Sequence, residues 1–213
     1  MGVEVKICGI TRPSDAAAAR EAGADWLGVV FAGGPRVVSV ERAASIVTAA
    51  GDRPVLGVFG AQHVATIPDL CRRARLAGAQ LHGNFVASDA AALRRAGLTV
   101  WRVVRLSGVD DLARLDEPWM VDAILVEPLV PHGEGGSGLA LSTGLARAAR
   151  TRLAARRMVL AGGLRPDSVA AAVGLVAPDV VDVSSGVESL PGIKDESKIA
   201  RFVEAARGRS AVR

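Results

Sequence analysis

Short apolar runs recur along the chain and alternate with longer segments that are rich in alanine. The runs consist mainly of valine, leucine and isoleucine, a composition typical of strands buried on both faces of a parallel sheet. Glycine, proline, aspartate or serine stands beside most of them, as expected for turns. The segments predicted as strands are Glu4–Ile7, Trp26–Val30, Pro54–Phe59, Gln80–His82, Thr99–Val104, Ala123–Val126, Met158–Ala161 and Val180–Val183.

The alanine-rich segments between these runs are predicted to be helices. Ser39 and Ser88 stand where a hydroxyl can cap the first turn of a helix. After the fifth strand, Ser107–Leu115 can supply only a short helix. Glycines predicted to end helices are Gly23, Gly51, Gly78 and Gly97. The predicted helices include Pro13–Ala22, Val40–Ala50, His63–Ala77, Ser88–Ala96, Ser142–Ala154 and Asp167–Val176.

Eight strands that alternate with eight helices predict an α/β fold, a single-domain (β/α)8 TIM barrel. We expect one domain over residues 1–213, with residues 208–213 as a frayed tail. The alternative is an open, doubly wound sheet. It is disfavoured because Gly9 stands alone after the first strand, without the glycine-rich turn of a dinucleotide-binding fold.

Composition limits the classes of partner. Half of the residues are apolar, but only 3% are aromatic, so a core must be built from Ala, Val, Leu and Ile. The net charge of +4 favours anionic small substrates. No dense basic block interleaved with aromatics points to nucleic acid. No apolar run reaches the roughly 18 residues of a membrane span. The N-terminus reads as a strand, so we expect a cytoplasmic protein without a signal peptide.

Reactive side chains stand just after several predicted strands, where TIM barrels place their active sites. Cys8 follows the first strand, Arg36 lies beyond the second, His82 ends the fourth and Glu127 follows the sixth. Each has an ordinary alternative role. Cys8 is either a base or a small core residue, Arg36 either grips a carboxylate or is a surface cation, and Glu127 is either a general acid or part of a rim salt bridge. His82 is either a hydrogen-bonded structural residue or a proton carrier.

The loops after the last strands predict a phosphate site. Glycines and serines there can present backbone N–H groups to a dianion. The residues concerned are Gly136, Gly138, Gly162, Gly163, Ser184, Ser185 and Gly186. No metal is expected, because the three histidines lie far apart without ligand spacing. The second cysteine, Cys71, stands on a predicted helix and is expected in the core.

Taken together, the segments VKICGIT, PRVVS, LGVF, QLHG, GGSG, LAGGLRPDSV, DVSSGVE and PGIKD resemble the phosphoribosylanthranilate isomerases of tryptophan biosynthesis. The resemblance implies an Amadori rearrangement of N-(5-phosphoribosyl)anthranilate by acid–base chemistry without a cofactor. It implies that Cys8 is the base, that Arg36 holds the anthranilate carboxylate and that the glycine loops hold phosphate. The partner it implies is a small phosphorylated aminosugar, bound by a monomer or homodimer.

The chain departs from the family pattern around the expected site. The family acid is an aspartate after the sixth strand, where this chain has Glu127, which reaches one methylene further. The loop GGSGLAL lacks the usual lysine and aromatic pair, and FAGGPR lacks a cation before Pro35. Two further interpretations therefore stay open. One is an Amadori isomerase for a different arylamine sugar phosphate in specialised metabolism. The other is a phosphosugar-binding barrel with weakened catalysis.

Overall fold

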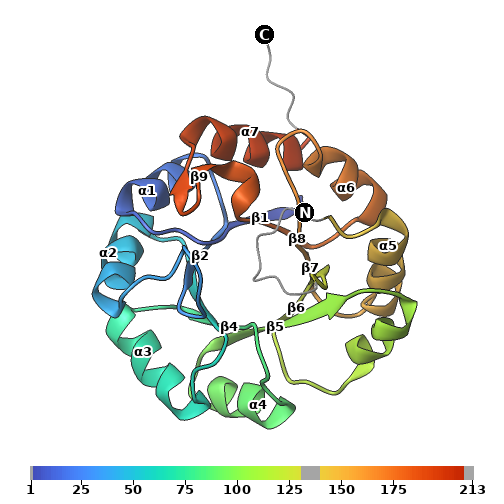
Figure 1. Ribbon diagram of the computed structural model, residues 1–213, viewed down its shortest axis with the longest axis horizontal. Helices are drawn as coiled ribbons and strands as arrows, with labels where there is room; N and C mark the ends of the chain where they lie inside the picture. The colour runs from blue at the N-terminus through green and yellow to red at the C-terminus, as the bar shows by residue number, and fades with distance from the viewer. Residues whose placement is uncertain (1, 131–139, 209–213) are drawn as a thin grey trace.

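Eight parallel strands form a closed barrel in the computed structural model, which describes residues 2–130 and 140–208. Each strand pairs with its neighbour in chain order, and β1 closes the barrel against β8. The ring of strands with helices outside it is visible in Figure 1. The strands are β1 (Glu4–Ile7), β2 (Trp26–Val30), β3 (Val55–Phe59), β4 (Gly78–Leu81), β5 (Thr99–Leu106), β6 (Ala123–Pro128), β7 (Met158–Leu160) and β8 (Val180–Val183). The predicted TIM barrel is therefore confirmed.

Helical segments follow every strand and cover the outside of the barrel. After β5 the covering segment is a 3-10 helix, η2, so the predicted short helix is present there in a tighter form. The segments are α1 (Pro13–Glu21), α2 (Val40–Ala50), η1 (Val64–Thr66), α3 (Ile67–Ala74), α4 (Ala87–Arg95), η2 (Val109–Asp116), α5 (Thr143–Arg152), α6 (Val169–Val176), η3 (Ser185–Val187) and α7 (Glu196–Ala206).

The predicted start of a helix agrees with the structure where the expected serine cap forms. The Ser39 hydroxyl accepts a hydrogen bond from the Arg42 N–H and starts α2 as predicted. The predicted Ser88 cap is wrong: α4 begins at Ala87, and the side chain of Asp89 instead accepts a bond from the Val86 N–H.

The predicted helix His63–Ala77 is also wrong in extent. It divides into η1 and α3. Helix α3 ends at Ala74, because the next residue, Arg75, adopts a left-handed conformation with φ of 56°. Gly78 is consequently not a helix end but the first residue of β4. A Cβ at Gly78 would collide with the Thr99 carbonyl on β5, so this glycine permits close approach of two strands.

Strands β5 and β6 are each two residues longer than predicted, because their pairing continues past Val104 and Val126. Arg105 pairs with Glu127 in the register, and Leu106 pairs with Pro128. Glu127 was expected after the sixth strand, yet it lies within β6. The pattern of apolar residues did not reveal this extension, because a charged residue, Arg105 or Glu127, interrupts each strand just before its end.

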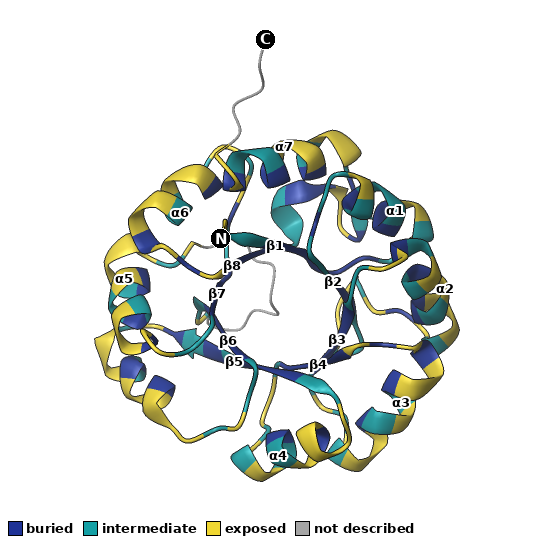
Figure 2. Ribbon diagram, turned by 180° about the vertical axis from the view of Figure 1, so that it is seen from behind, coloured by how far each residue is buried: buried dark blue, intermediate teal, exposed yellow. Residues whose placement is uncertain are grey.

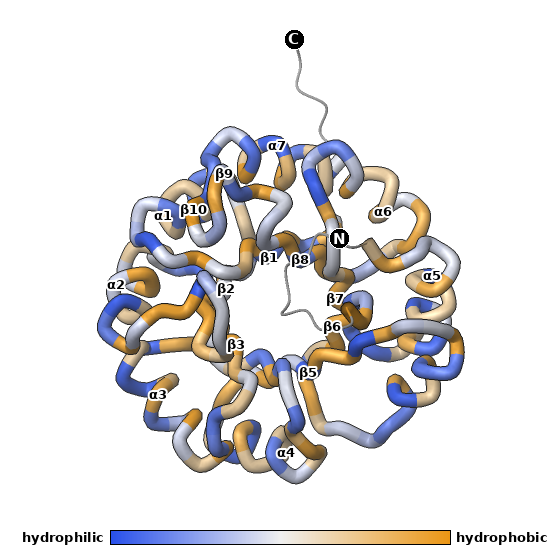
Figure 3. The backbone as a smooth tube through the Cα atoms, in the orientation of Figure 1, coloured by the Kyte–Doolittle hydropathy of each residue, from blue (hydrophilic) through white to orange (hydrophobic). Residues whose placement is uncertain are grey.

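Alternation along the strands separates two cores. One lies between barrel and helices, and Figure 2 shows the buried side of each helix turned toward the strands. The other fills the barrel interior, where Trp101 is fully buried and its ring lies 5.1 Å from that of Trp26. The interior core comprises Leu56, Trp101, Ala123, Leu125, Val159, Ala161 and Val180. In Figure 3 the strands are mainly hydrophobic, whereas the outer helices and loops carry both hydrophilic and hydrophobic residues.

The segment after β8 carries an addition that the sequence pattern did not indicate. Strands β9 (Glu188–Leu190) and β10 (Ile193–Lys194) form a small antiparallel hairpin between η3 and α7. This hairpin places Glu188 and Lys194 beside the ends of β1 and β8. Gly208 follows α7, and the rest of the predicted tail, residues 209–213, lies outside the described residues. Within the described ranges, no helix has both the length and the hydropathy of a membrane span.

Candidate active site

A cavity of about 300 Å³ opens where the barrel strands end. That volume lies at the lower end of the range of about 300–1,000 Å³ typical of small-molecule sites. The strands β2 to β6 and β8 contribute to its lining, as do residues that directly follow β1, β4 and β8 and the loops after β2 and β3. Its lining includes Cys8, Val30, Arg36, Val58, Gln80, His82, Arg105, Glu127, Asp182 and Ser184.

The cavity gathers five of the residues predicted from sequence: Cys8, Arg36, His82, Glu127 and Ser184. The other predicted phosphate residues that the structure describes, Gly162, Gly163, Ser185 and Gly186, follow β7 and β8 but are outside this lining. Gly136 and Gly138 lie outside the described residues.

Cys8 lies at the end of β1 beside a buried ion pair. Lys6, two residues earlier on the same face of the strand, is fully buried and donates to Asp182 Oδ1 at 2.8 Å. Gly28 on β2 leaves the space they need, since a Cβ there would lie 2.9 Å from Cys8 Sγ and 3.2 Å from Lys6 Nζ. The thiol and the ammonium group are therefore neighbours in the interior.

Opposing effects set the protonation of Cys8 and Lys6. Burial raises the pKa of the Cys8 thiol, the nearby Lys6 ammonium opposes that rise, and Asp182 adds to it. Burial disfavours the charge on Lys6, but Asp182 and Cys8 outweigh it and leave the Lys6 pKa above its ordinary value. A thiol with a raised pKa becomes a strong base once it ionises, and the charged Lys6 ammonium beside it stabilises the thiolate.

Glu127 faces the cavity from β6, with only 14% of its side chain exposed. Burial raises the pKa of this carboxyl, while a hydrogen bond from Arg105 Nε to Oε1 at 3.0 Å and the positive charge of Arg105 oppose the rise. A buried carboxyl with a raised pKa can carry a proton to a substrate oxygen. Glu127 also forms an ion pair with Arg105 at the rim, which is the ordinary alternative weighed from the sequence.

His82 is neutral. Burial first, and then the charge of Arg105, lower its pKa to about 4. Arg105 Nη2 contacts His82 Nε2, and because a guanidinium only donates, Nε2 accepts and the ring proton is assigned to Nδ1. The 3.6 Å approach of Nε2 to Glu127 Oε1 is therefore not an ion pair. His82 Nδ1 and Gln80 Oε1 are buried without hydrogen-bond partners among the described residues.

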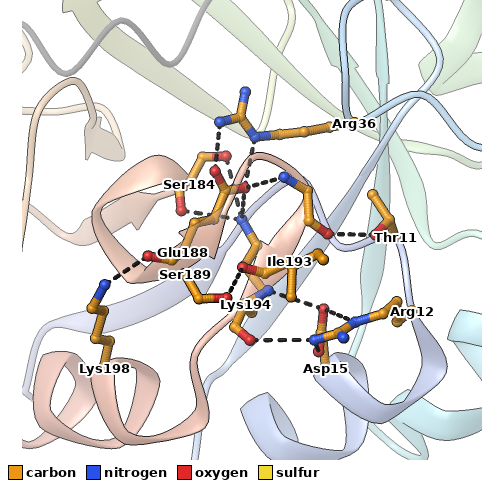
Figure 4. A network of polar contacts seen from close by, with 11 residues as sticks. Thr11, Arg12, Asp15, Arg36, Ser184, Glu188, Ser189, Ile193, Lys194 and Lys198 are labelled. Atoms are coloured by element: carbon orange, nitrogen blue, oxygen red, sulfur yellow. Dashed lines mark hydrogen bonds and ion pairs between the residues drawn. The ribbon is translucent and has the colours of Figure 1, made fainter.

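Arg36 is held rigidly at the rim by the β9–β10 hairpin (Figure 4). Its Nε and Nη2 donate to the two carboxylate oxygens of Glu188, each at 2.7 Å. Glu188 also accepts from Lys194 Nζ at 2.9 Å, and these two cations outweigh burial and lower the Glu188 pKa. Gly9, with φ of 70°, lets the Arg36 side chain pass, since a Cβ there would lie 2.5 Å from Arg36 Cδ.

The loops after β7 and β8 lie against each other. Gly162 and Gly163 both have positive φ, 91° and 65°, a conformation that favours glycine. Ser184 precedes the short helix η3, and Lys194 Nζ donates to the Ser184 carbonyl at 3.1 Å. A Cβ at Gly186 would collide with the Leu164 carbonyl, so glycine is needed where the two loops meet.

Five charged residues of the site were not identified from the sequence: Lys6, Asp182, Arg105, Glu188 and Lys194. Lys6 and Asp182 did have a signal, because each stands between two apolar residues of a strand. Arg105, Glu188 and Lys194 had none, since their role depends on pairing across strands and on the unpredicted hairpin. Cys71 is 1% exposed, and burial raises its pKa to about 12, which confirms its place in the core. Within residues 2–130 and 140–208, no cluster of His, Cys, Asp and Glu could hold a metal ion.

Comparisons with known proteins agree along nearly the whole chain. Residues 5–205 match the family model of N-(5'-phosphoribosyl)anthranilate (PRA) isomerase. The N-(5'-phosphoribosyl)anthranilate isomerase of Geobacter sulfurreducens is 41% identical over 210 residues, covering 97% of this chain and 99% of the relative.

Two solved structures are similar in fold and sequence. One is of monomers generated from the dimeric phosphoribosylanthranilate isomerase of Thermotoga maritima, with a TM-score of 0.84 and 34% identity, covering 97% of this chain and 99% of that one. The other is a phosphoribosylanthranilate isomerase in complex with reduced 1-(o-carboxyphenylamino)-1-deoxyribulose 5-phosphate. It has a TM-score of 0.84 and 33% identity, with the same coverage.

Proposed function

Because the chain belongs to the N-(5'-phosphoribosyl)anthranilate isomerase family, we propose that it catalyses the Amadori rearrangement of N-(5-phosphoribosyl)anthranilate. The product is 1-(2-carboxyphenylamino)-1-deoxyribulose 5-phosphate. This aldose–ketose isomerisation is a step of tryptophan biosynthesis. Conversion of the aldose to the ketose needs an acid at the furanose ring oxygen and a base at C2′, and no redox cofactor.

The observation that carries this proposal is that Cys8 and Glu127 line the same cavity, from β1 and β6. Glu127 donates a proton to the ring oxygen, and the ring opens to a Schiff base. The Cys8 thiolate removes the C2′ proton, and the enolamine then tautomerises to the ketone. The raised pKa values support these roles, because burial makes Glu127 bind a proton more tightly and makes the Cys8 thiolate a stronger base.

Substrate binding follows from the remaining residues. The fixed Arg36 presents its free edge to the anthranilate carboxylate, and the neutral His82 lies beside the substrate in the cavity. The phosphate is held by backbone N–H groups and hydroxyls of the loops after β6, β7 and β8. The loop residues proposed for this role are Gly136, Gly138, Gly162, Gly163, Ser184, Ser185 and Gly186.

The proposal extends to the setting of the protein. The partner is a small phosphorylated aminosugar, bound by a single-domain cytoplasmic enzyme that requires neither nucleic acid nor membrane. The chain acts as a monomer or homodimer, and the dimeric Thermotoga maritima relative favours the dimer.

Complementation tests this function in a cell. A strain that lacks this isomerase and requires tryptophan should grow when it carries the wild-type chain or the Cys71→Ala variant. It should not grow with Cys8→Ala, because that change removes the base and leaves the barrel core intact.

Failure of the wild type to support growth, despite folded protein in the cells, would contradict the proposal. Turnover of another arylamine ribose phosphate would then identify an isomerase of specialised metabolism. Binding without turnover would identify a phosphosugar-binding barrel.

A further inference from the structure

Three neighbouring strands are tied together at the mouth of the barrel by one arginine. Arg105 stands on β5, between His82 at the end of β4 and Glu127 on β6. Arg105 and Glu127 are partners in the β5–β6 register, so their side chains leave adjacent backbone positions on the same face. All three side chains line the cavity.

The guanidinium of Arg105 has two fixed contacts. Nε donates to Glu127 Oε1 at 3.0 Å, and Nη2 contacts His82 Nε2. Because a guanidinium is planar, contacts through two of its nitrogens fix its orientation as well as its position. The Arg105 side chain is one-third exposed, so its charge reaches the cavity as well as the carboxylate.

We propose that Arg105 is a positioning residue for the general acid: it braces against His82 and holds the Glu127 carboxyl at one place on the cavity wall. The inference rests on the proposed function, in which Glu127 protonates the substrate. Arg105 acts on the reaction through Glu127.

The chain needs such a brace because its acid is a glutamate. Glutamate has one more rotatable bond than aspartate, and an unrestrained carboxyl would sample several positions at the mouth. A hydrogen bond from a rigid donor selects one of them, and a misplacement of about 1 Å can lower a rate about 100-fold. The contact to His82 stops the arginine itself from swinging away.

Arg105 also sets the proton affinity of Glu127. Burial raises the pKa of Glu127, and Asp182 adds to this, whereas Arg105 and the deeper Lys6 oppose it. Loss of the Arg105 charge would therefore favour the protonated carboxyl and raise its pKa further. A residue that served only the packing of β5 would have no such effect.

The first test measures Glu127 without substrate. Carboxyl 13C resonances of glutamate-labelled protein are titrated in wild type, Arg105→Gln, Arg105→Lys and Arg114→Gln. Arg114 is a matched control, because it donates to the Arg105 carbonyl but has no contact with Glu127 among the described residues. The Glu127 midpoint should move to higher pH in Arg105→Gln and stay near wild type in the two other variants. An unchanged midpoint in Arg105→Gln overturns the proposal.

The second test is a double-mutant cycle on kcat/KM. Arg105→Gln should lower kcat/KM about 10- to 100-fold when Glu127 is present. In a Glu127→Gln background the same change should cost less than about 2-fold, because the group it positions is gone. An equal loss in both backgrounds shows that Arg105 acts on the substrate directly and overturns the proposal. Absence of wild-type turnover would instead contradict the proposed function. The titration needs no substrate, so it tests the effect of Arg105 on Glu127 even in that case.

Discussion

In the proposed mechanism, Lys6 makes the buried Cys8 thiol usable as a base. A thiolate in an apolar interior is disfavoured by the loss of hydration, and only a nearby cation or oriented dipoles can offset that loss. Lys6 supplies the cation, and both Asp182, through a 2.8 Å bond, and Cys8 favour its charged form. Lys6 and Asp182 are also register partners across the β1–β8 seam, so closure of the barrel brings them together.

Replacing the two members of this ion pair should move the Cys8 pKa in opposite directions. Lys6→Gln removes the cation and should raise the Cys8 pKa further. Asp182→Asn removes the anion that opposes the thiolate and should lower it. Iodoacetamide alkylation rates, measured against pH in a Cys71→Ala background, report the thiolate fraction of Cys8.

The direction of the Cys8 pKa shift in each variant distinguishes an electrostatic effect from a structural disturbance of the site. A general loosening of the site would expose Cys8 in both variants and shift both alkylation profiles the same way. Parallel shifts in a folded protein would therefore contradict the assigned role of Lys6.

At the scale of elements, three aspartates tie the starts of the strands together at the end of the barrel opposite the cavity. Each stands just before one strand and accepts a hydrogen bond from the backbone of the preceding strand of the ring. Asp25 accepts from Val5 N at 2.8 Å, Asp122 from Val100 N at 2.8 Å, and Asp179 from Met158 N at 2.7 Å. They satisfy N–H groups that would otherwise be left without a strand partner.

Loss of one such tie should weaken the fold and spare the chemistry. Asp122→Ala should lower the free energy of unfolding by about 1–3 kcal/mol, because the Val100 N–H loses its acceptor. It should leave kcat/KM within about 2-fold of wild type, since the site is at the opposite end of the barrel. Urea unfolding and steady-state kinetics measure the two effects.

Arg94→Ala is the matched control for this variant. Arg94 forms a partly exposed ion pair with Asp122 at 2.9 Å, so its removal breaks that pair but keeps the backbone tie. The expected cost is below about 1 kcal/mol. Equal destabilisation by both changes would assign the effect to the ion pair and contradict the account of the tie.

At the scale of the whole molecule, the order of elements already brings the site together. In a parallel barrel every strand ends at the same rim, so residues after different strands become neighbours whatever their distance in sequence. For this reason Cys8, Arg36, His82 and Glu127 could be predicted to meet, and they do. The apolar runs also predicted the number and order of the strands, because buried parallel strands carry few polar residues.

The electrostatic environment of the site could not be predicted in the same way. Arg105 stands in a strand whose pattern turns polar, and its meaning depends on the register that pairs it with Glu127. Glu188 depends on a hairpin formed after the last barrel strand. Such contacts join positions far apart in sequence and leave no periodic signal. The sequence therefore predicted side chains that meet at the cavity but not the charged residues that pair with them.

The most direct test of the central claim is the turnover of N-(5'-phosphoribosyl)anthranilate by purified wild type, Cys8→Ala and Glu127→Gln, with the product identified by chromatography. The account predicts that the wild type forms the carboxyphenylamino deoxyribulose phosphate. It predicts that each variant, folded as judged by circular dichroism, loses about 100- to 10,000-fold in kcat. A wild type that leaves the substrate unchanged, or variants that keep kcat within a few-fold of wild type, would contradict it.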